Sequence, residues 1–269
     1  MKILKNIDVL KKAINNISNL GFVPTMGSLH EGHISLIRES QKRCKKTLVT
    51  IYINPKQFNN KKDFKSYPKK MNADLKILKK MHVDYVFLPL TNEIYKKKIK
   101  QTKIPKKYKV LCAKFRKGHF EGVLNIMKRF LSIIKPKCLF MGEKDYQQLF
   151  LIKLLLINNS KTKLYSCKTI RDKNFAALSS RNFLLSNRDF KKAGIIAKNL
   201  INLKKNIGNS SIDNKYLLKK KNELNKKFNI KIEYLEARNS NNLNIYNKAK
   251  KFKLFVAYYI GGIRLIDNF

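Results

Sequence analysis

Short apolar segments alternate with amphipathic segments over the first two-thirds of the chain. The apolar segments are rich in β-branched and aromatic residues, and they predict strands at residues 21–24, 47–54, 83–89, 138–142 and 163–170. The amphipathic segments have helical periodicity and predict helices at residues 34–45, 72–81, 121–134 and 146–158. This alternation is typical of a mostly parallel sheet covered by helices on both faces, so we expect an α/β fold.

The sequence changes character after residue 186. Two lysine-rich helices and two strands, the second strand broken by two glycines, are predicted at residues 187–206, 213–228, 230–237 and 252–266. A turn is predicted at residues 208–211, and the lysine-rich stretch 96–109 is expected to be an exposed loop. A second, smaller α+β domain therefore fits this part of the chain.

A ten-residue segment from Pro24 to His33 follows the first of these strands and leads into a helix. It contains two of the four histidines of the chain, His30 and His33, at the predicted start of the helix. The first turn of a helix has unpaired N–H groups and the positive end of the helix dipole, which together favour phosphate binding. The alternatives are half of a metal site and a pair of surface residues. Because none of the four cysteines has metal-ligand spacing to a partner, we expect a phosphate site.

Two further polar segments follow predicted strands, at the edge of a parallel sheet where ligands bind. Gln57 lies in an Asn-Pro-Lys-Gln-Phe segment whose amides can bind hydroxyl and carboxylate groups, although Asn-Pro also simply ends strands. The segment 142–148 offers Lys144 as a charge for phosphate and Asp145 for ribose hydroxyls or a helix cap. Glycine, glutamate, lysine and aspartate are also ordinary loop residues. The prediction of ligand binding by this segment therefore rests on its position directly after a strand.

Serines and an arginine follow the last predicted strand of the larger domain. Ser179, Ser180 and Arg181 suit a phosphate clamp, and they equally suit a helix N-cap beside a surface arginine. The third histidine, His119, opens another predicted helix within the polar stretch 116–122. Three of the four histidines therefore lie in polar loops.

Composition limits the cellular setting that we expect. The chain has 269 residues, its longest apolar runs are too short to cross a bilayer, and no apolar signal segment follows the N-terminal lysines. We therefore expect a soluble, cytoplasmic protein with no membrane contact. In that reducing setting we expect no disulfide between the cysteines, which are Cys44, Cys112, Cys138 and Cys167.

The formal net charge of +43 would ordinarily indicate nucleic-acid binding. Here the charge is spread over nearly every predicted surface and is carried mostly by lysine, while asparagine, isoleucine, phenylalanine and tyrosine are also frequent. These residues have AT-rich codons, so we interpret the charge as compositional drift. We expect no specific nucleic-acid partner, only salt-dependent binding to polyanions.

Taken together, these segments closely resemble the pantoate–β-alanine ligase (pantothenate synthetase) family. The matching segments are residues 24–33, 54–58, 67–68 with Asp74, 118–122, 142–148, 178–182 and 262–268. The resemblance runs almost end to end and in family order, which makes it more specific than any single motif.

The resemblance implies a Rossmann-like nucleotidyltransferase domain over residues 1–170 and a smaller domain with the Ser-Ser-Arg clamp over residues 171–269. It implies an ATP-dependent, AMP-forming ligase of pantothenate and coenzyme A biosynthesis. In that family (R)-pantoate is activated as pantoyl adenylate with release of pyrophosphate, and the amine of β-alanine then attacks. The resemblance also implies Mg²⁺ bound with ATP, no organic prosthetic group, and a homodimer.

Roles for individual residues follow from the same resemblance. It implies that ATP contacts Met26, Gly27, Ser28, Leu29, His30, Glu31, Gly32, His33, Gly142, Glu143, Lys144, Asp145, Ile170, Leu178, Ser179, Ser180 and Arg181. His33 would be the catalytic proton donor of the His-x-Gly-His signature. Gln57 and Gln148 would hold pantoate, with Gln57 also near β-alanine, and Asp74 would help to place magnesium.

The chain departs from the family at three places. Asn72 and Ala73 stand where the family usually has further acidic residues, which weakens the expected metal contact of Asp74. Phe175 replaces a usual glycine, and Cys112-Ala113 replaces a usual Glu-Gly. None of these changes removes a residue that we expect to be indispensable.

Two other functions share features with this sequence. An adenylyltransferase that makes a dinucleotide shares the His-x-Gly-His signature, but it needs a second nucleotide pocket for which the sequence has no feature. A polyanion-binding protein that has lost its activity would have eroded site motifs, which is not the case, and basic residues gathered on one face.

Overall fold

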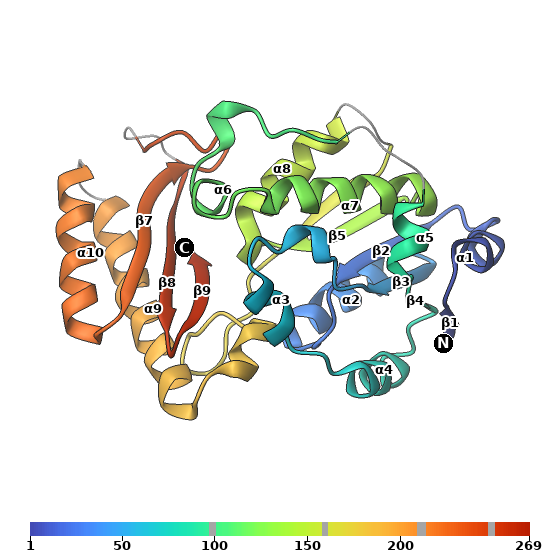
Figure 1. Ribbon diagram of the computed structural model, residues 1–269, viewed down its shortest axis with the longest axis horizontal. Coiled ribbons are helices and arrows are strands. Elements are labelled where there is room, and N and C mark those ends of the chain that lie inside the picture. Colours follow the sequence, from blue (N-terminus) through green and yellow to red (C-terminus); the bar gives the residue numbers. More distant parts are fainter. Residues whose placement is uncertain (97–100, 158–160, 209–213, 247–250) are drawn as a thin grey trace. The chain divides into compact units, whose positions relative to one another are not determined.

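The computed structural model describes residues 1–96, 101–157, 161–208, 214–246 and 251–269, which form two compact units (Figure 1). The first unit comprises Met1–Pro105 and Arg116–Lys168, and the second comprises Lys106–Phe115 and Thr169–Phe269. The expected division at residue 170 did not anticipate that Lys106–Phe115, from the middle of the larger predicted domain, belongs to the second unit.

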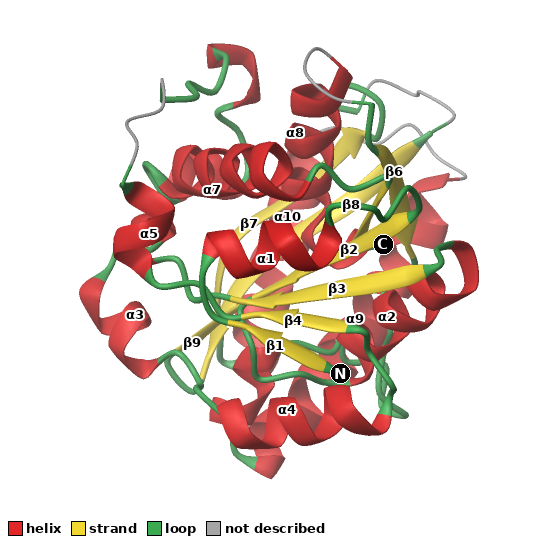
Figure 2. Cartoon of the chain, turned by 90° about the vertical axis from the view of Figure 1, so that its right-hand side faces the viewer, coloured by secondary structure: helices red, strands yellow, loops and turns green. Residues whose placement is uncertain are grey.

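A six-stranded sheet forms the centre of the first unit (Figure 2). The strands, given in chain order, are β1 (Lys2–Leu4), β2 (Leu20–Thr25), β3 (Lys46–Ile51), β4 (Tyr85–Phe87), β5 (Cys138–Gly142) and β6 (Lys163–Cys167). Their order across the sheet is β1-β4-β3-β2-β5-β6, and all neighbouring strands run parallel. The expected α/β architecture with a parallel sheet is therefore confirmed.

Helices cover both faces of this sheet. The main ones are α1 (Ile7–Ile14), α2 (Glu31–Arg43), α4 (Met71–Lys80), α7 (His119–Ile134) and α8 (Tyr146–Ile157). Alternate strand residues point to opposite faces. Val23 and Val49 pack in one apolar cluster with Ile37 of α2, whereas the ring of Phe22 lies edge-on against Phe130 of α7, with 5.9 Å between the ring centroids. Strands buried on both faces contain uninterrupted apolar runs, which is why the sequence predicted them.

Helix α2 lies close to the strand that precedes it. A Cβ atom at Gly21 would lie 2.1 Å from the hydroxyl oxygen of Ser40, so no larger residue fits at this point of β2. Ser40 in turn hydrogen-bonds the hydroxyl of Thr47, at 2.8 Å. These buried contacts fix the position of α2 over β2 and β3, and with it the position of the first turn of α2.

The structure differs from the predicted elements mainly at short segments. The elements that the sequence analysis did not predict are β1, α1, α3 (Lys61–Ser66), α5 (Thr91–Tyr95), α6 (Cys112–Phe115) and the 3₁₀ turns η1 (Pro55–Gln57), η2 (Lys106–Tyr108), η3 (Glu143–Asp145) and η4 (Ser180–Leu184). Turn η2 lies in the stretch 96–109, so that stretch is not entirely loop. The predicted turn 208–211 lies outside the described residues except for Gly208, which ends α9.

The second unit is built on a three-stranded antiparallel sheet in the order β7-β8-β9. Its elements are α9 (Asn187–Gly208), α10 (Asn214–Phe228), β7 (Lys231–Asn239), β8 (Phe252–Ile260) and β9 (Ile263–Asn268). Both helices lie beside the sheet (Figure 1) and share an apolar cluster with it, for example Leu200 and Leu224 with Val256. The predicted break at the two glycines is the turn between β8 and β9, where Gly261 and Gly262 have positive φ angles of 55° and 74°.

The segment Lys106–Phe115 belongs to the second unit because its side chains pack on β7. The ring of Phe115 stacks on that of Tyr234, with 5.7 Å between centroids. Cys112 Sγ lies 3.1 Å from the Tyr234 hydroxyl and accepts from Arg264, at 3.5 Å. Among the described residues, no helix combines the length and apolar character needed to span a bilayer.

Candidate active site

The order in which the chain adds strands reverses at one place in the sheet, between β2 and β5. From β2 the chain adds β3 and β4 on one side, and it then crosses over to add β5 on the other side of β2. Pairing joins β2 to β3 at six residue pairs, but it joins β2 to β5 only at Gly21 and Phe22. Pairing of β2 with β5 therefore stops before their carboxyl ends. Ligands of open parallel sheets bind at such a switch point, and the segments containing His30 and Lys144 both begin there.

His30 and His33 cap the first turn of α2. His30 is the N-cap residue, and its Nδ1 accepts a hydrogen bond from the amide of Gly32, at 3.1 Å. Nδ1 of His33 accepts from the amide of His30, at 3.4 Å, and the two ring centroids are 4.1 Å apart. Because a backbone N–H donates to Nδ1 of each ring, the proton of each neutral imidazole is on Nε2. Both rings thus have an Nε2–H left to donate.

The surroundings keep both imidazoles uncharged at neutral pH. Burial, reinforced by the positive charge of Lys144 and opposed by Asp145, lowers the pKa of His30 to about 4. Burial lowers the pKa of His33 well below its ordinary value, with smaller contributions from His30 and Lys144. The ammonium group of Lys144 lies 3.6 Å from a carboxylate oxygen of Asp145. The site therefore combines two neutral donors, one cation and a helix N-terminus, all of which stabilise phosphate oxygens.

The turn before His30 is held by Asp74 of α4. This carboxylate is only 2% exposed, and its two oxygens accept from the amides of Ser28 and Leu29, at 2.8 and 2.7 Å. Gly27 and Ser28 have positive φ angles of 79° and 51°, so the turn adopts a conformation that needs support. Asp74 supplies that support.

The residues present do not fit a magnesium ion held by the protein. The described residues contain no group of three or more histidine, cysteine, aspartate or glutamate side chains that could hold a metal. Asp74 is buried and already binds two amides, so it is poorly placed to coordinate a hydrated cation. The expected metal role of Asp74 has no support in this geometry.

Gln57 is buried at the end of η1, after β3. It is 8% exposed, and its side-chain amide donates to the sulfur of Met26, at 2.7 Å, within the segment that leads to His30. The structure thus brings together Gln57 and the end of β2, as strand-end positions predicted. Gln148 is half-buried on the first turn of α8, directly after the Lys144 turn.

The remaining predicted contacts lie in the second unit. The backbone of Leu178 donates to Ile170, at 3.0 Å, which brings these two residues together. Ser179 caps turn η4 in a reciprocal arrangement with Asn182, so the helix-cap interpretation of the serine pair is confirmed for Ser179. Ser180 is buried and Arg181 is half-buried.

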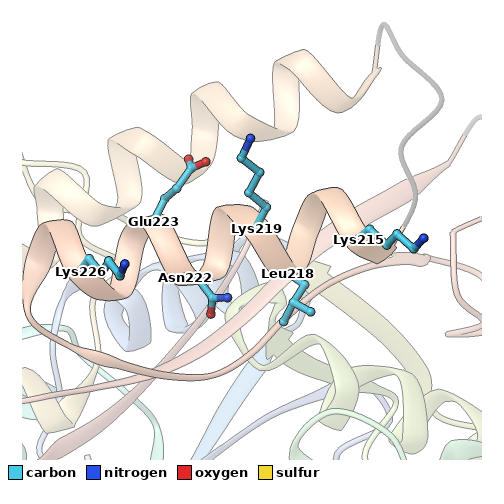
Figure 3. Close-up of a pocket in the computed structure, with 6 residues that line it drawn as sticks. All are labelled: Lys215, Leu218, Lys219, Asn222, Glu223 and Lys226. Carbon is cyan, nitrogen blue, oxygen red and sulfur yellow. The ribbon is translucent and has the colours of Figure 1, made fainter.

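A surface hollow lies elsewhere, on α10 (Figure 3). It has a volume of about 400 Å³ and is lined by Lys215, Leu218, Lys219, Asn222, Glu223 and Lys226. These residues recur every three or four positions, so they form one exposed face of a single helix. None is among the predicted site residues, and the close-up shows a helix surface without converging polar groups.

Comparison with known proteins decides the family. The sequence model of the family described as pantoate-beta-alanine ligase matches residues 2–269. The chain belongs to the pantoate–β-alanine ligase family. Pantothenate synthetase of Azobacteroides pseudotrichonymphae is 39% identical over 280 residues, covering 100% of this chain and 99% of that protein. Pantothenate synthetase of Leptospira interrogans is 40% identical over 255 residues, covering 93% and 89%.

Solved structures of family members have the same fold. The pantoate-beta-alanine ligase of Francisella tularensis, complexed with beta-gamma ATP and beta-alanine, is 35% identical, covers 100% of this chain and 97% of that one, and superposes with a TM-score of 0.86. Pantothenate synthetase of Thermus thermophilus is 27% identical, covers 100% and 99%, and has a TM-score of 0.93. The expected family, enzyme class and Rossmann-like fold with a smaller C-terminal part are thereby confirmed.

Two features of the site were not found by sequence reasoning. One is the support that Asp74 gives to the turn before α2, and the other is a contact of His119 with the backbone of Gln57. The only sequence signal was the presence of both residues in segments that match the family. Asp74 lies 46 positions from Ser28, and His119 lies 62 positions from Gln57. Contacts over such separations leave no local pattern in the sequence.

Proposed function

We propose that the protein joins pantoate to β-alanine in two steps at the carboxyl ends of β2 and β5. In the first step a carboxylate oxygen of pantoate attacks the α-phosphorus of ATP, and pyrophosphate leaves. In the second step the amine of β-alanine attacks the carbonyl of pantoyl adenylate, and AMP leaves while the amine loses a proton. Family membership and the family's name support this overall reaction, and the Francisella relative was solved in complex with beta-gamma ATP and beta-alanine.

The observation that carries the proposal is the pair of neutral imidazole donors at the start of α2, beside Lys144. In adenylate transfer the substrates react directly with each other and no covalent bond to the protein forms. Catalysis therefore consists of positioning the substrates and stabilising charge. His30 and His33 can each donate from Nε2 to phosphate oxygens, and Lys144 neutralises charge. We assign His33, the third residue of α2, the role of catalytic donor.

We propose the following ligand contacts. ATP contacts Met26–His33 and Gly142–Asp145, together with Ile170, Leu178, Ser179, Ser180 and Arg181 of the second unit. Pantoate contacts Gln57 and Gln148, because an amide donates and accepts at once and therefore suits a hydroxy acid better than a triphosphate. β-Alanine lies near Gln57.

The accompanying ion and assembly are also proposals. We expect Mg²⁺ to arrive with the phosphates of ATP rather than on Asp74, and we expect no organic prosthetic group. The homodimer that the family resemblance implied and the cytoplasmic location expected from the composition stay predictions.

The decisive experiment measures AMP formation with each substrate omitted in turn. We expect AMP only when ATP, pantoate and β-alanine are all present, and we expect pantoate-dependent adenylate without β-alanine. His33→Ala should lower the rate of adenylate formation by about 10²–10⁴-fold. His82→Asn is the matched control, since His82 is exposed after α4 with a positive φ of 52° that asparagine tolerates.

The alternatives predict other outcomes. A dinucleotide-forming adenylyltransferase would transfer AMP to a second nucleotide and ignore β-alanine. A polyanion-binding protein without activity would form no adenylate. A His33→Ala variant that keeps the turnover of the unaltered protein would show that the signature has been assigned the wrong role.

A further inference from the structure

The first turn of α7 is pressed against the backbone of Gln57. A Cβ atom at Gly122 would lie 2.2 Å from the carbonyl oxygen of Lys56 and 2.7 Å from Cα of Gln57, so only glycine fits. The side-chain amide of Asn54 donates to the carbonyl of Gly122, at 3.2 Å. The position of η1, and of Gln57 with it, is therefore set by the start of α7.

His119 makes the polar contact in this arrangement. It is the first residue of α7 and is 9% exposed. Its Nδ1 lies 2.7 Å from the carbonyl oxygen of Gln57, and its Nε2 lies 3.0 Å from Nη1 of Arg116. A carbonyl oxygen can only accept and a guanidinium group can only donate. The ring must therefore be neutral, with its proton on Nδ1 and its lone pair on Nε2.

Arg116 is itself held in place by the segment that follows Gln57. Its Nη2 lies 3.6 Å from a carboxylate oxygen of Asp63, and its Nε donates to Asn59, at 3.4 Å. The guanidinium group thus connects the ring of His119 to residues two and six positions after Gln57. His119 thus contacts Gln57, and Arg116 contacts the residues that follow it, Asn59 and Asp63.

We propose that His119 is a positioning residue for Gln57, and that Arg116 selects the tautomer of His119 that can do this. The hydrogen bond from Nδ1 fixes the backbone of Gln57, and the side-chain amide of Gln57 is thereby directed toward Met26. This inference rests on the proposed role of Gln57 in holding pantoate. In this arrangement His119 touches no reacting atom. Removal of its side chain should therefore weaken pantoate binding without affecting ATP binding.

Replacements of His119 by asparagine, glutamine and alanine separate this role from general packing. The amide nitrogen of asparagine can stand near the position of Nδ1, whereas that of glutamine stands near Nε2. We expect His119→Gln and His119→Ala to raise the KM for pantoate about tenfold, the loss of about one strong hydrogen bond. We expect His119→Asn to stay within about threefold of the original KM. The KM for ATP should change less than about twofold in all three.

The Gln57→Ala variant separates the proposed role of Gln57 in pantoate binding from the positioning role of His119. If Gln57→Ala leaves the KM for pantoate unchanged, the proposed role of Gln57 is wrong. If Gln57→Ala raises that KM but His119→Ala does not, or if His119→Ala raises the KM for ATP equally, the positioning role is wrong. In the Gln57→Ala background, His119→Ala should add no further increase.

A measurement on the unaltered protein tests the tautomer even if a variant fails to fold. Long-range ¹H–¹⁵N spectra of histidine-labelled protein should show His119 protonated on Nδ1 only, with the signal assigned by its loss in His119→Asn or, if that variant does not fold, by elimination with His30→Asn, His33→Asn and His82→Asn. A proton on Nε2, or exchange between the two nitrogens, would overturn the proposed geometry. Arg116→Met should allow such exchange, because it removes the donor that faces Nε2.

Discussion

The carboxylate of Asp74 binds the backbone amide of Leu29 across 45 positions of sequence, with 2.7 Å between Oδ1 and the amide nitrogen. Its second oxygen binds the amide of Ser28, at 2.8 Å. Burial raises the pKa of Asp74, and these two amide bonds oppose the increase. Helix α4, through Asp74, thus holds the turn that precedes His30 and His33.

Replacing Asp74 by asparagine should weaken this turn. One side of the new amide carries hydrogens that cannot accept from a backbone N–H, so one buried amide loses its partner at a cost of about 1–3 kcal/mol. We expect the free energy of unfolding in urea to fall by that amount, and amide hydrogen exchange at Ser28 and Leu29 to accelerate. The exposed Asp8→Asn substitution on α1 is the control. A higher Mg²⁺ requirement with unchanged stability would instead identify Asp74 as a metal ligand.

Acid should destabilise the start of α2 through His30. Its pKa is about 4 in the folded protein against an ordinary value of 6.5, so the unfolded chain binds the proton more readily between these values. The stability is fully present above about pH 6.5 and is lost as the pH falls toward 4. His30→Asn keeps an N-cap acceptor but does not titrate. Urea unfolding at a series of pH values should give a shallower acid loss for this variant, and identical slopes would contradict the assignment.

Gln57 and Gln148 should serve pantoate more than ATP. Neither amide carries the charge that a triphosphate requires, whereas both can exchange hydrogen bonds with a hydroxyl and a carboxylate. Gln57→Ala and Gln148→Ala should each raise the KM for pantoate by about tenfold and the KM for ATP by less than about twofold. Initial rates with one substrate varied at a time measure this. Equal increases for both substrates would show that the residues act on the fold of the site instead.

Phe175 occupies a position that suits glycine. Its φ is 75°, and its ring is 44% exposed beneath the ammonium group of Lys198, 4.9 Å from the ring centroid. A residue with a Cβ in this conformation costs about 1–2 kcal/mol. Phe175→Ala keeps that cost and loses the ring contact, whereas Phe175→Gly loses the ring contact but removes the cost. We therefore expect the glycine variant to unfold at a higher urea concentration than the alanine variant, and the reverse order would show that φ carries no strain here.

The sequence predicts those parts of the fold whose signals are local. Strands β2, β3 and β5 are buried on both faces, so they consist mostly of apolar and β-branched residues, and the polar segments after them mark the carboxyl edge. Strand β1 has only three residues, too few to show a period. The paired roles of Asp74 and His119 depend on contacts between distant segments, which the residues themselves do not encode locally.

The placement of Lys106–Phe115 in the second unit affects the order in which the chain can fold during its synthesis. Cys112 is made 122 positions before its partner Tyr234 and 152 positions before Arg264. At about 5–20 residues per second, the first of these delays lasts about 6–25 seconds. Throughout that interval the ring of Phe115 lacks the Tyr234 ring on which it stacks in the folded protein, and the rest of the first unit, Arg116–Lys168, is made before that partner appears. The first unit also cannot be cut out as one continuous fragment without carrying this segment along, stripped of the strand that normally covers it.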